Sequence, residues 1–295
     1  MVGQMLKTRY KIPNGRAINA LMAGYIGTAA QITVDIFNLS SSEMDKVFHT
    51  PGTNNVDVMF NLKRNEEAFK KSRLRFKDIM KYKRNTDTLA ICGAGPSLDY
   101  HLAEIRDRNL LTVGINKGAI IGNTDIILVA DRLVPASWLD KIKTRNKVLF
   151  TCPSANFEIT NLPWKERYIF KTRLESMPWK YRHVYSRNIV LSTGIHIAYL
   201  LGFKKIELYG CDFAYKPGKY YSGEKQHTDD KIFWPSQEGA PYTVTGVDGE
   251  EWITNRQFYN HSRNIIALCN LAQNSGYIDI INKSSGIFWF GKRNH

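Results

Sequence analysis

Short hydrophobic runs separated by amphipathic stretches occupy the chain from residue 88 onward. Seven runs predict strands: TLAICG, LTVGIN, DIILVAD, KVLFTC, RYIFK, KIELYGCD and YIDIIN. They are hydrophobic at nearly every position, which is typical of parallel strands covered on both faces. The intervening stretches SLDYHLAEIRDR, TGIHIAYLLGF and NRQFYNHSRNIIALCNLAQNSG predict helices, the last ending at Gly276. The alternation predicts an α/β fold with a doubly wound, mostly parallel sheet of Rossmann-like type.

Residues 1–86 lack this alternation and contain turn signals such as IPNG and TPGTNN, so we expect a mainly helical N-terminal region. We therefore divide the chain into residues 1–86 and an α/β domain of residues 87–295. Within the α/β domain, residues 216–251 form a long insertion rich in Gly, Pro, Tyr and Trp. A loop of that length in a compact domain is usually functional. The aromatic residues Trp234 and Tyr242 in this insertion, and Trp252 directly after it, suit an unstacked base, a sugar or core packing equally well.

Charge adds a candidate partner to this picture. The net charge is +14, and residues 63–84 hold ten Lys/Arg against three Asp/Glu, which is half of the excess. Such clustering favours a polyanion such as DNA, which Lys70, Arg73 and Lys77 would contact through its phosphates. A solvated basic helix face explains the same residues.

Other features of the composition exclude several classes. Hydrophobic residues make up 43% of the chain, which excludes wholesale disorder. The cysteines Cys92, Cys152, Cys211 and Cys269 lack zinc-site spacing, so we expect reduced core residues. No signal peptide and no transmembrane segment is recognised, and we expect a cytoplasmic protein. Oligomeric state is left open.

Polar and glycine residues follow most of the predicted strands. Ligands of open α/β sheets bind at the carboxyl ends of the strands, where these residues would converge. They are Gly93, Gly95 and Ser97; Asn116 and Lys117; Asp131 and Arg132; Ser154; and Asp212 with Tyr215. The segment GAGPS after the first strand suits backbone contact with a phosphate, although a plain strand-to-helix turn looks the same.

Four sequence blocks resemble a known family. CGAGPSLD, INKGA, STGIHIAYLLGFKKIELYGCDFAY and VTGVDG are similar to the MptE-like group, which includes archaeal 6-hydroxymethylpterin diphosphokinase and the motility accessory factors that glycosylate flagellin. The same blocks resemble bacterial lipooligosaccharide sialyltransferases. The resemblance covers roughly residues 88–285.

The resemblance implies a nucleotide site at this edge of the sheet. In the sialyltransferases the corresponding turn and asparagine hold the nucleotide, which implies Gly93, Gly95, Pro96, Ser97 and Asn116 here. In the same sialyltransferases, a Ser/Thr-Gly pair at the start of a helix contacts the donor, which implies Ser192, Thr193 and Gly194 here. Simple N-capping of the helix by Ser192 or Thr193 explains the hydroxyls as well. Asp131 joins the set because of its position after the third predicted strand.

The resemblance also implies catalytic roles. YGCDFAYKPGKYY is similar to a G-x-D-F segment whose aspartate orients the nucleotide, here Asp212, and whose tyrosines stabilise the departing phosphate, here Tyr215 and Tyr220 or Tyr221. Capping of the next turn is the other explanation for Asp212. His227 is the candidate general base and His261 the second choice, with a solvated loop histidine as the alternative.

These observations favour a nucleotide-sugar-dependent glycosyltransferase that transfers a sugar to an acceptor hydroxyl, with DNA as one candidate acceptor. No Asp-x-Asp follows a predicted strand, so we expect a nucleotide-sugar donor and no metal requirement. Two alternatives remain: a pterin-type diphosphokinase using ATP and Mg²⁺, and a non-catalytic nucleotide- or nucleic-acid-binding protein.

Overall fold

The computed structural model describes eight stretches of the chain: residues 80–82, 86–130, 142–152, 155–169, 172–173, 184–185, 190–217 and 241–289. The helical prediction for the N-terminal region lies almost wholly outside these residues. So does the larger part of the insertion predicted at residues 216–251.

The seven predicted strands all form and belong to one sheet, which confirms the α/β doubly wound fold. They are β1 (Thr88–Cys92), β2 (Leu111–Ile115), β3 (Ile126–Val129), β4 (Val148–Thr151), β5 (Glu166–Ile169), β8 (Lys205–Tyr209) and β11 (Asp279–Asn282). Their order is β11-β8-β1-β2-β3-β4-β5. Five pairings, β11–β8, β8–β1, β1–β2, β2–β3 and β4–β5, are parallel.

The chain divides into two compact units, Met1–Leu74 with Val129–Asn188 and Arg75–Leu128 with Ile189–His295. The first contains β4, β5, η4 (Thr144–Asn146), α9 (Phe157–Asn161), β6 (Thr172–Arg173) and β7 (Val184–Tyr185). The second contains η1 (Met80–Tyr82), η2 (Pro96–His101), α7 (Leu102–Asp107), α8 (Gly118–Ile121), α10 (Val190–Leu200), β9 (Tyr242–Thr245), β10 (Glu251–Thr254) and α11 (Arg256–Asn274). The boundary between residues 86 and 87 stays a prediction.

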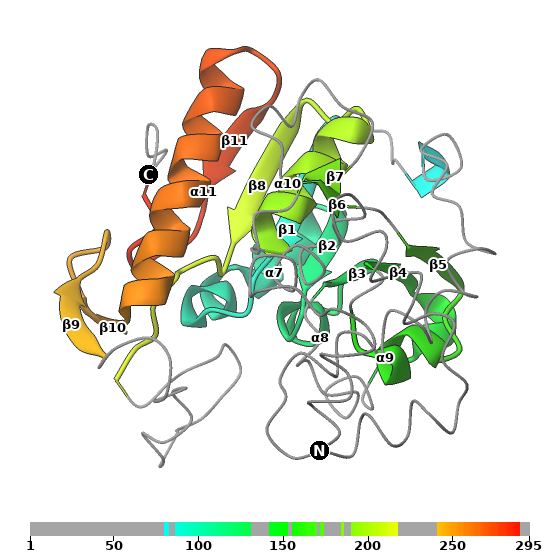
Figure 1. Cartoon of the computed structure of the whole chain (residues 1–295), viewed down its shortest axis with the longest axis horizontal. Coiled ribbons are helices and arrows are strands. Elements are labelled where there is room, and N and C mark those ends of the chain that lie inside the picture. The colour runs from blue at the N-terminus through cyan, green and yellow to red at the C-terminus, as the bar shows by residue number, and fades with distance from the viewer. Residues whose placement is uncertain are drawn as a thin grey trace, which may run out of the picture. The chain divides into compact units, whose positions relative to one another are not determined.

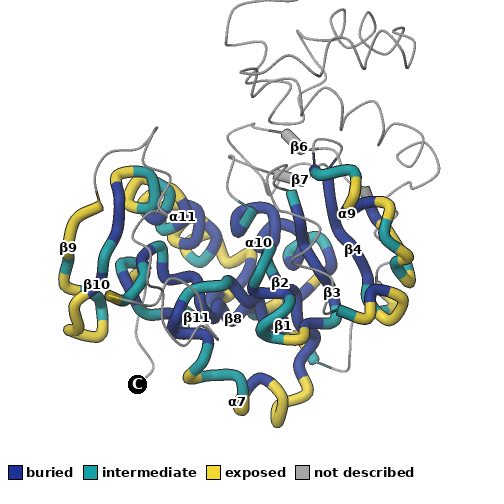
Figure 2. Tube along the Cα trace, turned by 90° about the horizontal axis from the view of Figure 1, so that it is seen from below, coloured by how far each residue is buried: buried dark blue, intermediate teal, exposed yellow. Residues whose placement is uncertain are grey.

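Helices cover both faces of the strands in the second unit. Figure 2 shows α10 and α11 on one side of these strands and α7 on the other, with the buried strands between them. α11 runs from the β9–β10 hairpin at one end to β11 at the other (Figure 1). Its start is capped by Asn255, whose side chain accepts a hydrogen bond from the Phe258 N–H at 2.8 Å. Beyond its end, Gly276 has a φ of 66°, the left-handed C′ conformation that the sequence predicted.

The hydrophobic core includes strand residues that helices cover on both faces of the sheet. In β1 the residues Leu89, Ala90, Ile91 and Cys92 are completely buried. All four cysteines are buried and free of disulfides, which confirms the prediction of reduced core residues.

The insertion predicted as one loop contains a β-hairpin at its end. β9 and β10 pair antiparallel, with Trp252 opposite Val244. The pattern concealed β9 because three of its four residues are exposed and the strand therefore lacks hydrophobic alternation.

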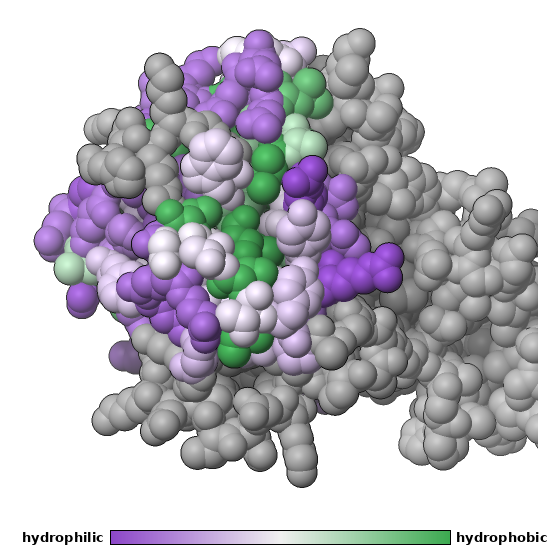
Figure 3. Space-filling view, turned by 90° about the vertical axis from the view of Figure 1, so that its left-hand side faces the viewer, coloured by the Kyte–Doolittle hydropathy of each residue, from purple (hydrophilic) through white to green (hydrophobic). Residues whose placement is uncertain are grey.

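Aromatic residues make up much of the exposed hydrophobic surface in the described part of the chain. They are Tyr100, Tyr242, Tyr259, Tyr277 and Trp289, joined by Leu271. Figure 3 shows a band of hydrophobic residues flanked by hydrophilic ones on one face. No helix among the described residues is long and apolar enough to cross a bilayer.

Candidate functional site

The candidate site lies in the second unit, where β1 and β8 are neighbours in the sheet. β2 and then β3 lie on one side of β1, and β8 and then β11 lie on the other, so the strand order reverses here. In doubly wound sheets, ligands bind at the carboxyl ends of the strands beside such a reversal. The turn at residues 93–97 follows β1, Asn116 follows β2, and residues 210–217 follow β8.

The glycine turn at residues 93–97 is bonded to the segment after β8. The Gly93 N–H donates to the Tyr209 carbonyl at 2.7 Å, and the Gly95 N–H donates to the Gly210 carbonyl at 2.8 Å. The Ser97 N–H donates to Asp212 Oδ2 at 2.9 Å. These three N–H groups, which the sequence suggested for a phosphate, are therefore engaged within the protein.

Close approach of backbones explains why this turn contains glycine. A Cβ atom on Gly93 would lie closer than 3.0 Å to the Gly210 carbonyl, and one on Gly95 would lie equally close to the Asp212 carboxylate. Gly210 itself has a φ of 61°, which favours glycine. Pro96 is buried as the first residue of η2. Whether the turn also contacts a nucleotide stays a prediction.

Asp212 joins three segments of the chain. Its Oδ2 accepts from the Ser97 N–H, and its Oδ1 accepts from Ser97 Oγ at 2.5 Å and from the Ser285 N–H at 3.0 Å. The residue is only 1% exposed. Asp212 therefore binds the start of η2 and the turn after β11, and capping of the turn next to it in sequence stays an alternative.

Burial dominates the electrostatics of Asp212. It raises the pKa of this carboxyl group to about 6, although the hydrogen bonds from Ser97 and Ser285 favour the charged form. The geometry therefore makes Asp212 a residue that positions the glycine turn.

Sequence patterns did not predict that Ser285 and Gly286 contribute to this site. Ser285 binds Asp212, and the Ile287 N–H donates to the Asp212 carbonyl at 3.0 Å. A Cβ on Gly286 would lie closer than 3.0 Å to the same carbonyl. The segment KSSGIF lies 73 residues beyond Asp212, and only the pairing of β11 with β8 brings it there.

Asn116 presents a buried oxygen to the site. Its backbone is left-handed, with a φ of 50°, and its N–H donates to the Leu128 carbonyl at 3.1 Å. Its Oδ1 is buried and has no hydrogen-bond partner among the described residues. An unpartnered buried oxygen costs free energy unless a ligand or water satisfies it.

The first turn of α10 contains Ser192, Thr193 and Gly194. Because the helix includes Val190, Ser192 and Thr193 lie inside it and neither is its N-cap residue. Thr193 is completely buried, and its Oγ1 has no hydrogen-bond partner among the described residues. Gly194 packs against the sheet, since a Cβ there would meet Leu128 at 3.4 Å and Ile91 at 3.5 Å.

Of the remaining predicted site residues, the structure describes two, Tyr215 and His261. Tyr215 exchanges two backbone hydrogen bonds with Ile253, at 2.9 and 2.8 Å, and so ties the chain after β8 to β10. The predicted residues outside the described part are Asp131, Tyr220, Tyr221, His227, Lys70, Arg73 and Lys77. His261, the second choice of base, has a pKa lowered by burial.

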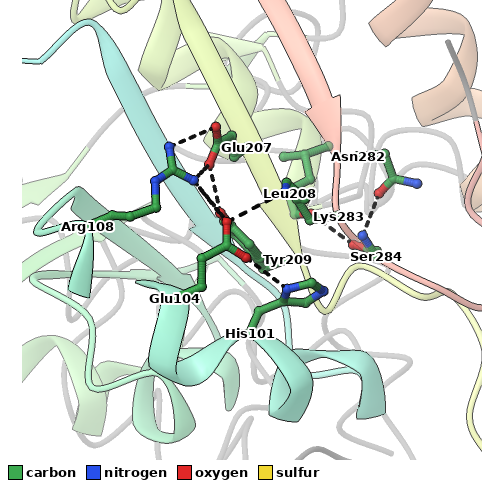
Figure 4. A network of polar contacts seen from close by, with 9 residues as sticks. All are labelled: His101, Glu104, Arg108, Glu207, Leu208, Tyr209, Asn282, Lys283 and Ser284. Carbon is green, nitrogen blue, oxygen red and sulfur yellow. Dashed lines mark hydrogen bonds and ion pairs between the residues drawn. The ribbon is translucent and has the colours of Figure 1, made fainter. Parts of the chain in front are cut away.

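A polar network holds α7 against the sheet beside the glycine turn (Figure 4). Arg108 donates to both carboxylate oxygens of Glu207, at 2.5 and 3.1 Å, and Tyr209 Oη donates to Glu207 at 2.7 Å. Burial favours a higher pKa for Glu207, but the bonds from Arg108 and Tyr209 outweigh it and lower the pKa. His101 and Lys283 contact Glu104 at 3.2 and 3.6 Å, which links η2, α7 and the end of β11. The network therefore fixes the helices that follow the turn.

The residues described here include no group of three His, Cys, Asp or Glu side chains placed to hold a metal ion.

The parallel sheet with helices on both faces, and candidate ligand-binding residues at a strand-order reversal, define a doubly wound α/β protein. Residues 57–218 match the family described as 6-hydroxymethylpterin diphosphokinase MptE-like, and since this is more than half of the chain, the chain belongs to that family. This match confirms the resemblance of the sequence blocks to the MptE-like group.

Among solved structures, a MAf glycosyltransferase from Magnetospirillum magneticum AMB-1 is similar, with a TM-score of 0.50 and 13% sequence identity. The similarity covers 82% of this chain but only 42% of that chain, so this protein spans less than half of that structure. At this identity the likeness concerns the fold alone. None of the curated proteins matches the chain.

Proposed function

We propose that the protein is a glycosyltransferase that uses a nucleotide-sugar donor and binds the nucleotide beside Asn116 and Thr193. The observation that supports this most directly is that Asn116 Oδ1 and Thr193 Oγ1 are two of the four buried side-chain oxygens that lack hydrogen-bond partners among the described residues. Both belong to positions that the sequence assigned to nucleotide binding. The family and the similar structure are both named for transferases, which agrees with this class of enzyme.

The two oxygens suit different groups of a nucleotide. A carboxamide oxygen accepts, so Asn116 Oδ1 would take a ribose hydroxyl or an exocyclic amine. The Thr193 hydroxyl both donates and accepts, and it lies in the first turn of a helix, where the backbone dipole favours an anion. The glycine turn at residues 93–97 would form a rigid neighbour of the nucleotide, with Asp212 holding it in place.

In the proposed reaction, the acceptor hydroxyl oxygen forms a bond to the anomeric carbon of the sugar. The bond between that carbon and the phosphate oxygen breaks, and its electron pair leaves with the nucleotide. His227 would take the hydroxyl proton, and Tyr215 and Tyr221 would donate hydrogen bonds to the leaving phosphate in place of a metal. The donor and the independence from metal are part of this proposal.

The family description favours a second candidate, diphosphoryl transfer from ATP to a pterin. It predicts a strict Mg²⁺ requirement and release of AMP. A nucleotide-sugar donor predicts turnover in the presence of a chelator and release of the nucleotide from its sugar.

Thr193→Val provides the sharpest test of the nucleotide site. Valine preserves the shape and removes only a hydroxyl that lacks a partner, so the melting temperature should stay the same or rise. Binding of CMP-, UDP- and GDP-sugars, measured by titration calorimetry, should weaken by about ten-fold for the preferred nucleotide.

Thr124→Val serves as the matched control. Thr124 is equally buried, but its hydroxyl donates to the Ile126 carbonyl at 3.0 Å. This variant should lose about 1 kcal/mol of stability and keep nucleotide affinity. If Thr193→Val binds every nucleotide as the wild type does, the proposed site is wrong.

A further inference from the structure

A cluster outside the nucleotide site surrounds the ammonium group of Lys216. Lys216 Nζ pairs with the Glu250 carboxylate and donates to Tyr100 Oη at 3.3 Å. It lies 5.1 Å from the ring centre of Trp252 and 5.7 Å from that of Tyr100, which is within cation–π range. Three separate segments therefore meet at one ammonium group: η2, the chain after β8, and the β9–β10 hairpin.

The base of this cluster is rigid. Trp252 is completely buried, and its Nε1 donates to Asp248 at 2.9 Å. A Cβ on Gly246 would collide with the Trp252 ring, so glycine is needed for the indole to pack there. The Tyr215–Ile253 bridge fixes the backbone next to Lys216.

The top of the cluster is open to solvent. Tyr100 is 67% exposed and the Glu250 side chain is 58% exposed. The Tyr100 ring and the Glu250 carboxylate are therefore both accessible to a ligand from solvent. The arrangement presents an aromatic ring, a hydrogen-bond donor and a hydrogen-bond acceptor side by side.

The charge balance indicates the class of ligand. Lys216 and Glu250 compensate one another, so an anion would have to displace the carboxylate and would gain little. A neutral saccharide matches all three groups. Its C–H face carries partial positive charge toward the negative face of an aromatic ring, and its hydroxyls both donate to a carboxylate and accept from an ammonium.

We propose that Tyr100, Lys216 and Glu250 form a subsite for a neutral saccharide, which is the acceptor in the proposed transfer. This rests on the proposed function, and it names the acceptor class. Tyr100 and Ser97 lie on the same short helix, η2, so the subsite adjoins the end of the glycine turn.

The test uses the full-length protein and saturation-transfer NMR with lactose and maltotriose as neutral probes. 3′-Sialyllactose and inorganic phosphate serve as anionic probes. The wild type should transfer saturation to a neutral saccharide, and Tyr100→Ala should weaken its affinity by about ten-fold. Tyr100→Phe keeps the ring and should retain binding, and Lys216→Met should lose it.

Tyr277→Ala is the control, because Tyr277 is an exposed tyrosine next to the amino end of β11, at the opposite edge of the sheet. It should leave saccharide binding unchanged. Absence of binding by both neutral probes, equal binding by Tyr100→Ala, or a preference for phosphate that depends on Lys216 would overturn the proposal. Nucleotide affinity, measured on the same variants, separates this result from failure of the nucleotide site, which depends on Asn116 and Thr193.

Discussion

Gly95 and Gly194 are both candidate site residues, yet a methyl group would meet different surroundings at each. At Gly95 it would press against the Asp212 carboxylate and the Gly210 carbonyl, and both are held by hydrogen bonds. At Gly194 it would make ordinary contacts of 3.4–3.8 Å with Leu128 and Ile91. The backbone of Gly95, with a φ of −66°, accepts alanine, so any cost there is steric.

We therefore expect Gly95→Ala to lower the free energy of unfolding by about 2 kcal/mol, because overpacking forces Asp212 to move. Gly194→Ala should leave stability unchanged or raise it by about 0.5–1 kcal/mol, since alanine is the better helix former. Urea unfolding of the two variants measures both values. Equal stability of Gly95→Ala and the wild type would show that the turn does not pack on Asp212.

The carboxyl group of Asp212 gives the protein a specific pH dependence. Its folded pKa of about 6 is above the ordinary value of 3.8, so between these values the folded state binds the proton more tightly than the unfolded state. The contribution of Asp212 to stability is then fully present below pH 3.8 and is lost as the pH rises through about 6. The slope in that window approaches about −1.4 kcal/mol per pH unit.

Unfolding free energies of the wild type and Asp212→Asn, compared at the same pH values, isolate this contribution because other groups cancel. The unfolding free energy of the wild type minus that of Asp212→Asn should fall from pH 4 to pH 6 and stay level above pH 7. A level difference for Asp212→Asn across the whole range would contradict the assignment.

At the scale of elements, α7 is attached to the sheet by one nearly buried carboxylate. The Glu207 side chain is 3% exposed, whereas that of Arg108 is 36% exposed. Removal of either partner leaves the other without its charge-assisted bonds. The attachment matters for the site because η2, which carries Ser97 and Tyr100, leads directly into α7.

A double-mutant cycle with Arg108→Met and Glu207→Gln should give a coupling energy of about 1–2 kcal/mol, reduced by the exposure of Arg108. The cycle with Lys205→Gln and Glu207→Gln should give about 0.5 kcal/mol or less, because Lys205 makes a single contact with Glu207 at 3.5 Å, whereas Arg108 binds both carboxylate oxygens. Similar coupling energies in both cycles would show that the bidentate geometry adds nothing.

The elements also show what the sequence could reveal. The strands β1, β2, β3, β4 and β8 were readable because they are buried on both faces, which leaves a continuous hydrophobic run such as IILV in β3. The position of Asn116 at the end of β2 was readable because polar residues end those runs. The β9–β10 hairpin could not be predicted from the sequence, because β9 is mostly exposed and lacks a hydrophobic run. The role of Ser285 could not be predicted either, because it depends on the long-range pairing of β11 with β8.

At the scale of the whole molecule, the excess positive charge and the proposed saccharide subsite belong to different residues. The chain carries a net charge of +14, and half of it is concentrated in residues 63–84, outside the described helices and strands apart from η1. The ion pair beside Tyr100 is compensated, and it gives a polyanion no local advantage. We therefore expect polyanions and neutral saccharides to bind through different residues.

Binding of a duplex oligonucleotide should weaken linearly with the logarithm of salt concentration, with a slope of about −0.9 for each phosphate contact. Replacement of Lys70, Arg73 and Lys77 by Gln removes three positive charges. The magnitude of the slope should fall by the amount expected for roughly three phosphate contacts. Fluorescence anisotropy between about 50 and 200 mM salt measures the slope. Lys204→Gln, Lys205→Gln and Arg263→Gln together remove the same charge elsewhere in the chain and should change the slope much less. Equal slopes for the two triple variants would mean that only net charge attracts the oligonucleotide, and an absence of binding even at about 50 mM salt would remove DNA as a partner.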